Sequence, residues 1–117
     1  MEVNEFDFNF PRGDTCPYYF DLTDNDGNEV DLSESELYFT FKRNSKTQNY
    51  LFQKRLSRGE IVQDGTTIML VISHEDTARL SYGDYFYDIQ LKSGDYVKTL
   101  YKGIVTLDEE GTWIDNE

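Results

Sequence analysis

The sequence has little cysteine, histidine and positive charge, and it has no long apolar run. A single Cys16 in 117 residues excludes an internal disulfide framework. Together with the single His74 it cannot supply the three or four Cys and His ligands that zinc sites generally use. No stretch reaches the roughly 18 apolar residues that cross a membrane as a helix, and Glu2, Glu5 and Asp7 stand where an export signal needs basic residues. We therefore expect a protein of a reducing compartment, with no membrane span.

Basic residues are scarce and unevenly placed. The chain has 11 Lys and Arg against 23 Asp and Glu, which gives a net charge of −12. Such a charge repels phosphates, so direct binding of DNA or RNA is disfavoured. Residues 42–58 nevertheless hold six bases and no acid, between two acidic segments. These blocks are compatible with electrostatic steering toward a protein partner or a second copy of the chain, although a solvated basic hairpin is the favoured interpretation.

Motifs for catalysis and metal binding are weak. The only histidine, His74, lies in a polar segment, and no serine has the flanking glycines of a nucleophile elbow. Residues 24–31 resemble the start of a calcium loop, but Gly27 falls at the fourth place instead of the sixth and Ser35 stands where a Glu is needed. A hairpin turn fits this segment better. We expect no enzyme activity, no metal and no cofactor.

The tripeptide Arg12-Gly13-Asp14 spells an integrin-binding motif. In an acidic chain without an export signal, we interpret it as a β-turn in which Gly13 reverses the chain and Asp14 bonds to backbone near Thr15.

What the chain has in abundance is aromatic residues in alternating patterns. Aromatic residues make up 15% of the sequence, and apolar side chains recur at every second position from one end to the other. The expected strands are 6–10, 17–22, 37–43, 50–56, 60–63, 66–72, 83–91 and 96–107, with helical turns at 31–36 and 73–80. Short strands at this spacing predict an all-β, immunoglobulin-like antiparallel β-sandwich with one or two short helical turns.

Further details follow from the same pattern. We expect residues 1–117 to form a single domain, with 108–117 as a loosely held C-terminal tail that Trp113 could pin. A bulge is expected at Lys102-Gly103, and Asp88 receives only a structural place in its strand. Leu80, Gly83 and Tyr85 have the spacing of a tyrosine corner, in which the phenol bonds back to upstream backbone. We assign that role to Tyr85, and an ordinary strand tyrosine remains the alternative.

The run Gly-Asp-Tyr-Phe-Tyr-Asp-Ile-Gln-Leu at 83–91, with Thr99-Leu100 and Gly-Ile-Val-Thr-Leu at 103–107, resembles a known family. It is similar to the immunoglobulin-like N-terminal domain of phage baseplate upper proteins and small tail or prophage proteins of phages of Gram-positive hosts. Residues 12–15, 31–33 and 39–42, and Gly27, fit the same family in the same order. Members often continue into fibre or receptor-binding regions, whereas this chain stops at Glu117.

The resemblance implies a non-enzymatic virion assembly module that acts by binding other proteins, as a stand-alone accessory or adaptor subunit. It would lie in the host cytoplasm during expression and in the virion if it is structural.

A second hypothesis belongs to another class. A small acidic phage-type protein can mimic nucleic acid and block the basic groove of a host defence nuclease, an anti-CRISPR or anti-restriction role. The carboxylates that would face such a nuclease are Asp21, Asp24, Asp26, Glu29 and Asp31.

Overall fold

The computed structural model describes residues 4–44, 46 and 49–109, and most of them lie in strands. The strands are β1 (Asn4–Glu5), β2 (Phe8–Pro11), β3 (Cys16–Asp21), β4 (Glu36–Lys42), β5 (Phe52–Arg55), β6 (Ile61–Asp64), β7 (Thr67–Ile72), β8 (Gly83–Ser93) and β9 (Tyr96–Asp108). Two short helices interrupt them, the 3-10 helix η1 (Leu56–Arg58) and the single turn α1 (His74–Thr77). In this part of the chain no helix is long and apolar enough to cross a membrane.

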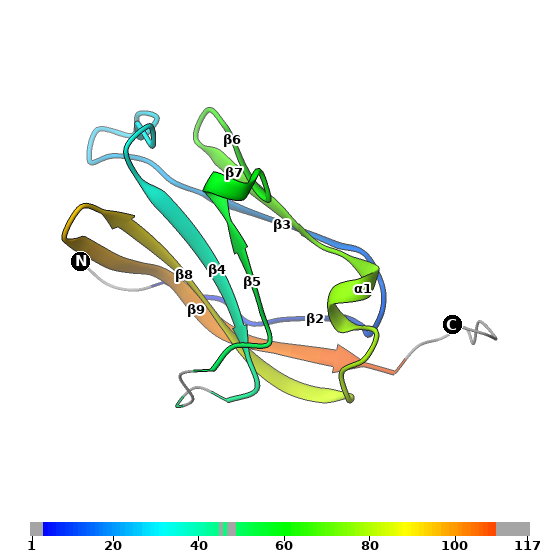
Figure 1. Ribbon diagram of the computed structural model, residues 1–117. Coiled ribbons are helices and arrows are strands. Elements are labelled where there is room, and N and C mark those ends of the chain that lie inside the picture. The colour runs from blue at the N-terminus through cyan, green and yellow to red at the C-terminus, as the bar shows by residue number, and fades with distance from the viewer. Residues whose placement is uncertain (1–3, 45, 47–48, 110–117) are drawn as a thin grey trace.

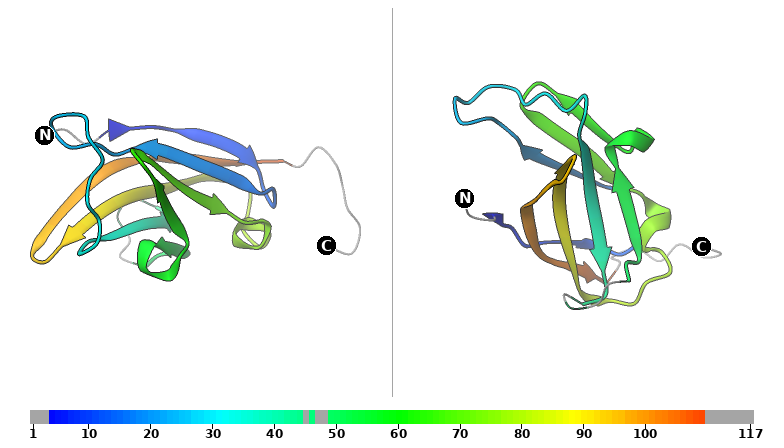
Figure 2. Two further views of the ribbon diagram at one scale, coloured as in Figure 1. Left: turned by 90° about the horizontal axis from the view of Figure 1, so that it is seen from above. Right: turned by 60° about the vertical axis from the view of Figure 1, so that its left-hand side comes forward.

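The strands form two facing sheets (Figures 1 and 2). One sheet has six strands in the order β1-β9-β8-β4-β5, with β2 also paired to β9, and the other has three in the order β3-β7-β6. In chain order, β3, β4, β6, β7, β8 and β9 take the places of immunoglobulin strands B to G: B, D and E lie in one sheet and C, F and G in the other. The predicted immunoglobulin-like sandwich is confirmed.

The N-terminal strands depart from the expected antiparallel pairing. β1 and β2 both run parallel to β9, and the remaining pairs of the two sheets are antiparallel. The chain therefore adds its first strands beside its last one, and β3 becomes an edge of the smaller sheet.

The single strand expected over 6–10 is divided at Phe6 and Asp7. The Tyr87 hydroxyl donates to the Phe6 carbonyl at 2.6 Å, and the Ile104 amide donates to Asp7 Oδ1 at 2.8 Å. These two bonds replace regular ladder pairing at this point. A methyl group on Gly103 would lie 2.1 Å from the Phe6 carbonyl oxygen, so the glycine permits the close approach of the two backbones.

The bulge that we expected at Lys102-Gly103 lies a few residues earlier in β9. The register between β8 and β9 shifts between Ile89 and Gln90, which pair with Tyr101 and Thr99. Leu100 is the extra residue. Gly103 is instead the site of a close backbone contact with Phe6. A glycine inside a strand pattern indicates either feature, so the sequence alone does not distinguish them.

Side chains that alternate inward from both sheets form the core. Its members are Phe10, Tyr18, Phe20, Leu22, Leu32, Leu37, Phe39, Phe41, Ile61, Ile68, Leu70, Ile72, Tyr85, Tyr87, Ile89, Val105 and Leu107. Aromatic rings fill its centre. Phe39 stacks on Tyr87 with ring centroids 5.4 Å apart, and Phe41 stacks on Tyr85 at 5.2 Å.

Three local expectations need correction. Residues 31–36 form no helix, because Asp31 Oδ1 accepts the Ser33 amide in a tight turn and Glu36 already begins β4. The strand expected over 50–56 ends at Arg55, and η1 follows it. Asp108 is not part of a tail, since it is the last residue of β9 and pairs with Pro11. The rest of the expected tail beyond residue 109, including Trp113, lies outside the described residues.

The helical turn expected over 73–80 is present as α1. Asp76 caps it, since its carboxylate accepts the Ser73 amide at 2.7 Å. Lys54 of β5 lies 2.7 Å from the same carboxylate and ties the edge of the larger sheet to α1.

Candidate functional site

The outer face of the three-stranded sheet carries a continuous group of apolar side chains. Strand alternation sends Tyr18, Phe20 and their counterparts on β6 and β7 into the core, and sends the intervening side chains outward. The register places Pro17 opposite Val71, and Met69 between Tyr19 and Val62. We call this group the apolar face, and its residues are Pro17, Tyr19, Val62, Met69 and Val71.

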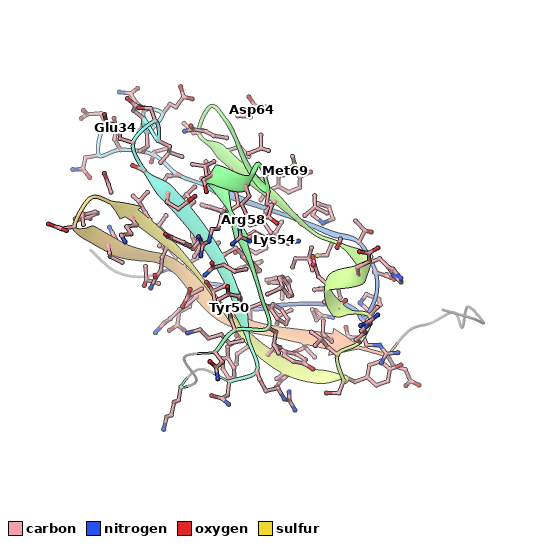
Figure 3. All side chains as sticks on the ribbon, viewed as in Figure 1. Glu34, Tyr50, Lys54, Arg58, Asp64 and Met69 are labelled. Atoms are coloured by element: carbon pink, nitrogen blue, oxygen red, sulfur yellow. The ribbon has the colours of Figure 1, made fainter. Side chains whose placement is uncertain are left out.

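Much of the apolar face is open to solvent. Tyr19 is 60% exposed, Val62 47% and Val71 40%. A hollow of about 290 Å³ adjoins it and is lined by Val62, Met69 and Val71 together with Lys54 and Glu60. Figure 3 labels Met69 on β7 and Lys54 on β5, which both line this hollow. The arrangement can receive an apolar side chain of another protein.

The sequence held a signal for this face that alternation alone hides. β7 reads Ile68-Met69-Leu70-Val71-Ile72, so that both phases of the strand are apolar. A strand of an antiparallel sheet with one solvated face alternates apolar and polar residues, whereas continuous apolar runs are typical of strands covered on both faces. β7 is covered on its inner face only.

The exposed edge of β3 is poorly suited to pairing with another strand. Leu22 donates to Thr66, which makes Pro17, Tyr19 and Asp21 the residues whose backbone groups point to the edge. Pro17 has no amide hydrogen to offer, and the Asp21 carbonyl already accepts the Tyr101 hydroxyl at 3.2 Å. A partner therefore gains more from the apolar face than from this edge.

The five carboxylates proposed to mimic nucleic acid are all exposed. Asp21 ends β3, and the other four lie between β3 and β4. Two of them serve local turns: Asp24 Oδ1 accepts the amides of Asp26 and Asn28, both at 2.9 Å, and Asp31 Oδ1 accepts that of Ser33 at 2.9 Å. The hydrogen bonds from Ser33 lower the pKa of Asp31. Another of the five, Glu29, forms an isolated β-bridge with Thr23.

Tyr85 lies at the start of β8, the counterpart of immunoglobulin strand F. Its hydroxyl donates to the Ser81 carbonyl at 2.8 Å and lies 3.1 Å from the Ser81 hydroxyl. This is the bond to upstream backbone that the spacing of Leu80, Gly83 and Tyr85 predicts. The residue has a structural place and does not contribute to the apolar face.

The Arg12-Gly13-Asp14 segment packs against α1. Gly13 has φ 83° and the Asp14 amide donates to the Pro11 carbonyl, which makes the expected turn. The expected bond from Asp14 to backbone near Thr15 is not among the hydrogen bonds of the described residues. The Gly13 amide donates to the hydroxyl of the buried Thr77 at 2.8 Å, and its carbonyl contacts Nδ1 of the exposed His74. The Arg12-Gly13-Asp14 segment and His74 therefore both have structural roles, because they join the β2–β3 turn to α1.

Two of three comparisons with known proteins found no match for this chain. No family model matches it, and no curated protein matches it. A solved family 123 glycoside hydrolase from Clostridium perfringens, described in a study of glycolipid glycan hydrolysis, is similar in backbone with a TM-score of 0.43 and 9% identity. The match covers 94% of this chain and 24% of the hydrolase, so the chain spans about a quarter of that protein's length. A likeness at this level carries no argument about function.

Proposed function

We propose that this protein is a non-enzymatic assembly or adaptor subunit of a phage or prophage tail or baseplate, and that it acts by binding another protein. The apolar face supports the binding of another protein, and the resemblance of residues 83–91 and 103–107 to the baseplate family supports the tail or baseplate. Exposed aromatic and aliphatic side chains in one contiguous group are costly on a protein that works alone, because water contacts them without compensation. A partner that covers Tyr19, Val62 and Val71 removes this cost.

The borders of the face indicate the chemistry of the partner. Asp21 and Asp64 flank Thr67 on the outer side of the sheet, at the end away from Val71. Both are exposed in a chain whose net charge is −12. The complementary surface has an apolar centre, with one side chain that fills the hollow beside Met69, and Lys or Arg toward the acidic end.

The test uses two lysine substitutions of exposed tyrosines. Tyr19→Lys puts a charge at the centre of the apolar face, whereas Tyr96→Lys changes a tyrosine of similar exposure, 57%, at the far β8–β9 turn. Tagged proteins are used to recover partners from an induced lysogen, and the strongest partner is then purified and titrated. We expect a virion structural protein that binds wild type and Tyr96→Lys alike and binds Tyr19→Lys at least about tenfold more weakly.

Two results would contradict this function. One is equal binding by the two lysine variants, which would remove the apolar face from the interaction. The other is salt-sensitive inhibition of a defence nuclease that is lost when Asp21, Asp24, Asp26, Glu29 and Asp31 are changed to Asn or Gln. That result would establish the nucleic-acid mimic instead.

A further inference from the structure

A groove of about 440 Å³ lies on the opposite side of the molecule, on the outer face of the larger sheet. It crosses β4, β8 and β9 and is bordered by Glu5 of β1 and by Asp7, which follows β1. The side chains that matter for its chemistry are Lys42, Phe86, Asp88, Thr99, Lys102 and Ile104. All but Lys102 are half-buried.

Asp88 occupies the middle of this face on the central strand β8. Its neighbours across the strands are Thr40 and Lys102. The Thr40 hydroxyl is already engaged by the Gln53 side chain at 3.0 Å, and the Lys102 ammonium lies toward Glu5, 3.7 Å from its carboxylate. Within the described part of the chain the Asp88 carboxylate has no hydrogen-bond donor. Burial raises its pKa, and the charge of Lys42 lowers it.

Lys42 on β4 is a second charged group that lines the groove. Its charge acts on Asp88, yet among the described residues no carboxylate lies within ion-pair distance of its ammonium. Both groups are half-buried, and no fully buried side-chain nitrogen or oxygen of the described residues lacks a hydrogen-bond partner, so water reaches both of them. An acceptor and a donor that face one groove and lack protein partners are therefore placed to bind a molecule that offers both hydroxyl donors and oxygen acceptors.

The charges around the groove select a neutral molecule. An anion would meet Asp88, Glu5 and Asp7, and a cation would meet Lys42 and Lys102. Apolar surface of Phe86 and Ile104 lies next to the unpaired groups, since the two residues pair across β8 and β9. A neutral ligand with hydroxyls on its rim and C–H groups on one face fits all of these features.

We propose that this groove binds a neutral pyranose unit of a glycan, with its hydroxyls on Asp88 and Lys42 and its C–H face on Phe86. Adjacent ring hydroxyls can donate to the carboxylate and accept from the ammonium at once, so that both charges are satisfied without an ionic ligand. The inference is independent of the proposed function, because the apolar face belongs to the other sheet.

The test is a titration of isotope-labelled protein followed by amide NMR. The probes are methyl glucoside, methyl galactoside and methyl mannoside and, titrated whatever the outcome with these, a purified neutral cell-wall polysaccharide that contains the same sugars. We expect shift changes confined to β4, β8 and β9 around Asp88. Response to the polysaccharide but not to the free glycosides would identify a cell-surface source, and response to both would identify the ring itself as sufficient.

Variants and charged probes make the test specific. Asp88→Asn and Lys42→Met should each weaken binding by at least about tenfold, because each removes a charge-assisted hydrogen bond. Asp95→Asn, in the β8–β9 turn, and Tyr19→Lys, on the apolar face, should leave it unchanged. Galacturonate and glucosamine, which add a charge of either sign to the same ring, should bind more weakly than the neutral glycosides.

The proposal is overturned if neither the neutral glycosides nor the neutral polysaccharide shifts the groove amides, or if the shifts survive both Asp88→Asn and Lys42→Met. It is also overturned if either charged sugar binds better than its neutral counterpart. Loss of sugar binding in Tyr19→Lys with Asp88 intact would contradict the separation of the two faces.

Discussion

The hydroxyls of Tyr18 and Tyr87 lie 2.9 Å apart and join the two sheets through the core. Tyr87 stands two residues after the corner residue Tyr85, where immunoglobulin domains have the second cysteine of their inter-sheet disulfide, and Tyr18 faces it from the counterpart of strand B. Phe39 on β4 contacts both rings at 5.9 and 5.4 Å, in the place of the tryptophan that packs on that disulfide. A hydrogen-bonded tyrosine pair thus occupies the position of the cross-link.

The direction of these bonds predicts unequal costs for removing the two hydroxyls. Tyr87 donates to the Phe6 carbonyl at 2.6 Å, so it accepts from Tyr18. Tyr87→Phe leaves the buried Tyr18 hydroxyl and the part-buried Phe6 carbonyl without this partner and should lower the free energy of unfolding by about 2 kcal/mol. Tyr18→Phe removes one bond and should cost about 1 kcal/mol. Urea denaturation of the two variants measures this difference.

The double variant provides the control for that chain of bonds. Tyr18→Phe combined with Tyr87→Phe should cost little more than Tyr87→Phe alone, because the shared bond is lost only once. Equal costs for the single variants, or strict additivity, would show that the hydroxyls do not form one directed chain.

The tyrosine corner should contribute independently of this pair. Tyr85→Phe removes the bond to the Ser81 carbonyl and should lower the free energy of unfolding by about 1 kcal/mol, with the ring packing retained. Thermal melting compares it with Tyr96→Phe, which changes an exposed tyrosine at the β8–β9 turn and should have no measurable effect. An unchanged melting midpoint for Tyr85→Phe would show that the bond to the Ser81 carbonyl does not stabilise the fold.

Gly103→Ala should loosen the segment between β1 and β2, residues Phe6 and Asp7, from β9. The new methyl group would lie 2.1 Å from the Phe6 carbonyl oxygen, a distance that backbone cannot accommodate without moving. We expect a loss of about 1–3 kcal/mol in stability from this overpacking. Hydrogen exchange should accelerate most at the amides of Phe6 and Ile104, which donate to Lys102 and Asp7.

Gly27→Ala is the matched control, because Gly27 has a positive φ of 81° but open space around its Cβ position. It should lose stability through backbone strain alone, with no change of exchange at Phe6. Accelerated exchange at Phe6 in both variants would indicate general destabilisation and contradict a local role for Gly103.

Alternation alone predicted most strands and the sandwich, because each strand buries one face and its side chains repeat with a period of two. Motif spacing, and not alternation, assigned Tyr85 to the tyrosine corner and Asp76 to the helix cap, because both motifs depend on residues a few positions apart. The parallel partners of β1 and β2, and the close approach at Gly103, come from contacts about a hundred residues apart along the chain. No local pattern encodes these contacts.

The candidate surfaces show the same limit. The continuous apolar run of β7 was visible in the sequence, but only the sheet order reveals that its outer phase meets Tyr19 and Val62 at an uncovered face. Asp88 received only a structural place because its strand alternates regularly. Its lack of a hydrogen-bond donor depends on where the Thr40 and Lys102 side chains lie, which the sequence does not state.

Asp88→Asn should stabilise the protein at neutral pH. Burial raises the pKa of Asp88 above its ordinary value, so the folded state binds this proton more tightly than the unfolded state does. The contribution of the residue to stability is therefore complete below the ordinary carboxyl pKa of about 4 and falls as pH rises through the higher pKa of the folded protein. Above that window the ionised carboxylate opposes folding, and the neutral amide removes the penalty.

Melting temperatures of wild type and Asp88→Asn across pH 3 to 8 should therefore diverge as pH rises and converge at the acidic end. Lys42 lowers the pKa of Asp88 and partly offsets the penalty, so Lys42→Met should lower the melting temperature at neutral pH in the wild-type background and much less in the Asp88→Asn background. A melting temperature of Asp88→Asn that stays below wild type at neutral pH would mean that the carboxylate is satisfied within the fold. The groove would then lack the unpaired acceptor on which sugar binding depends.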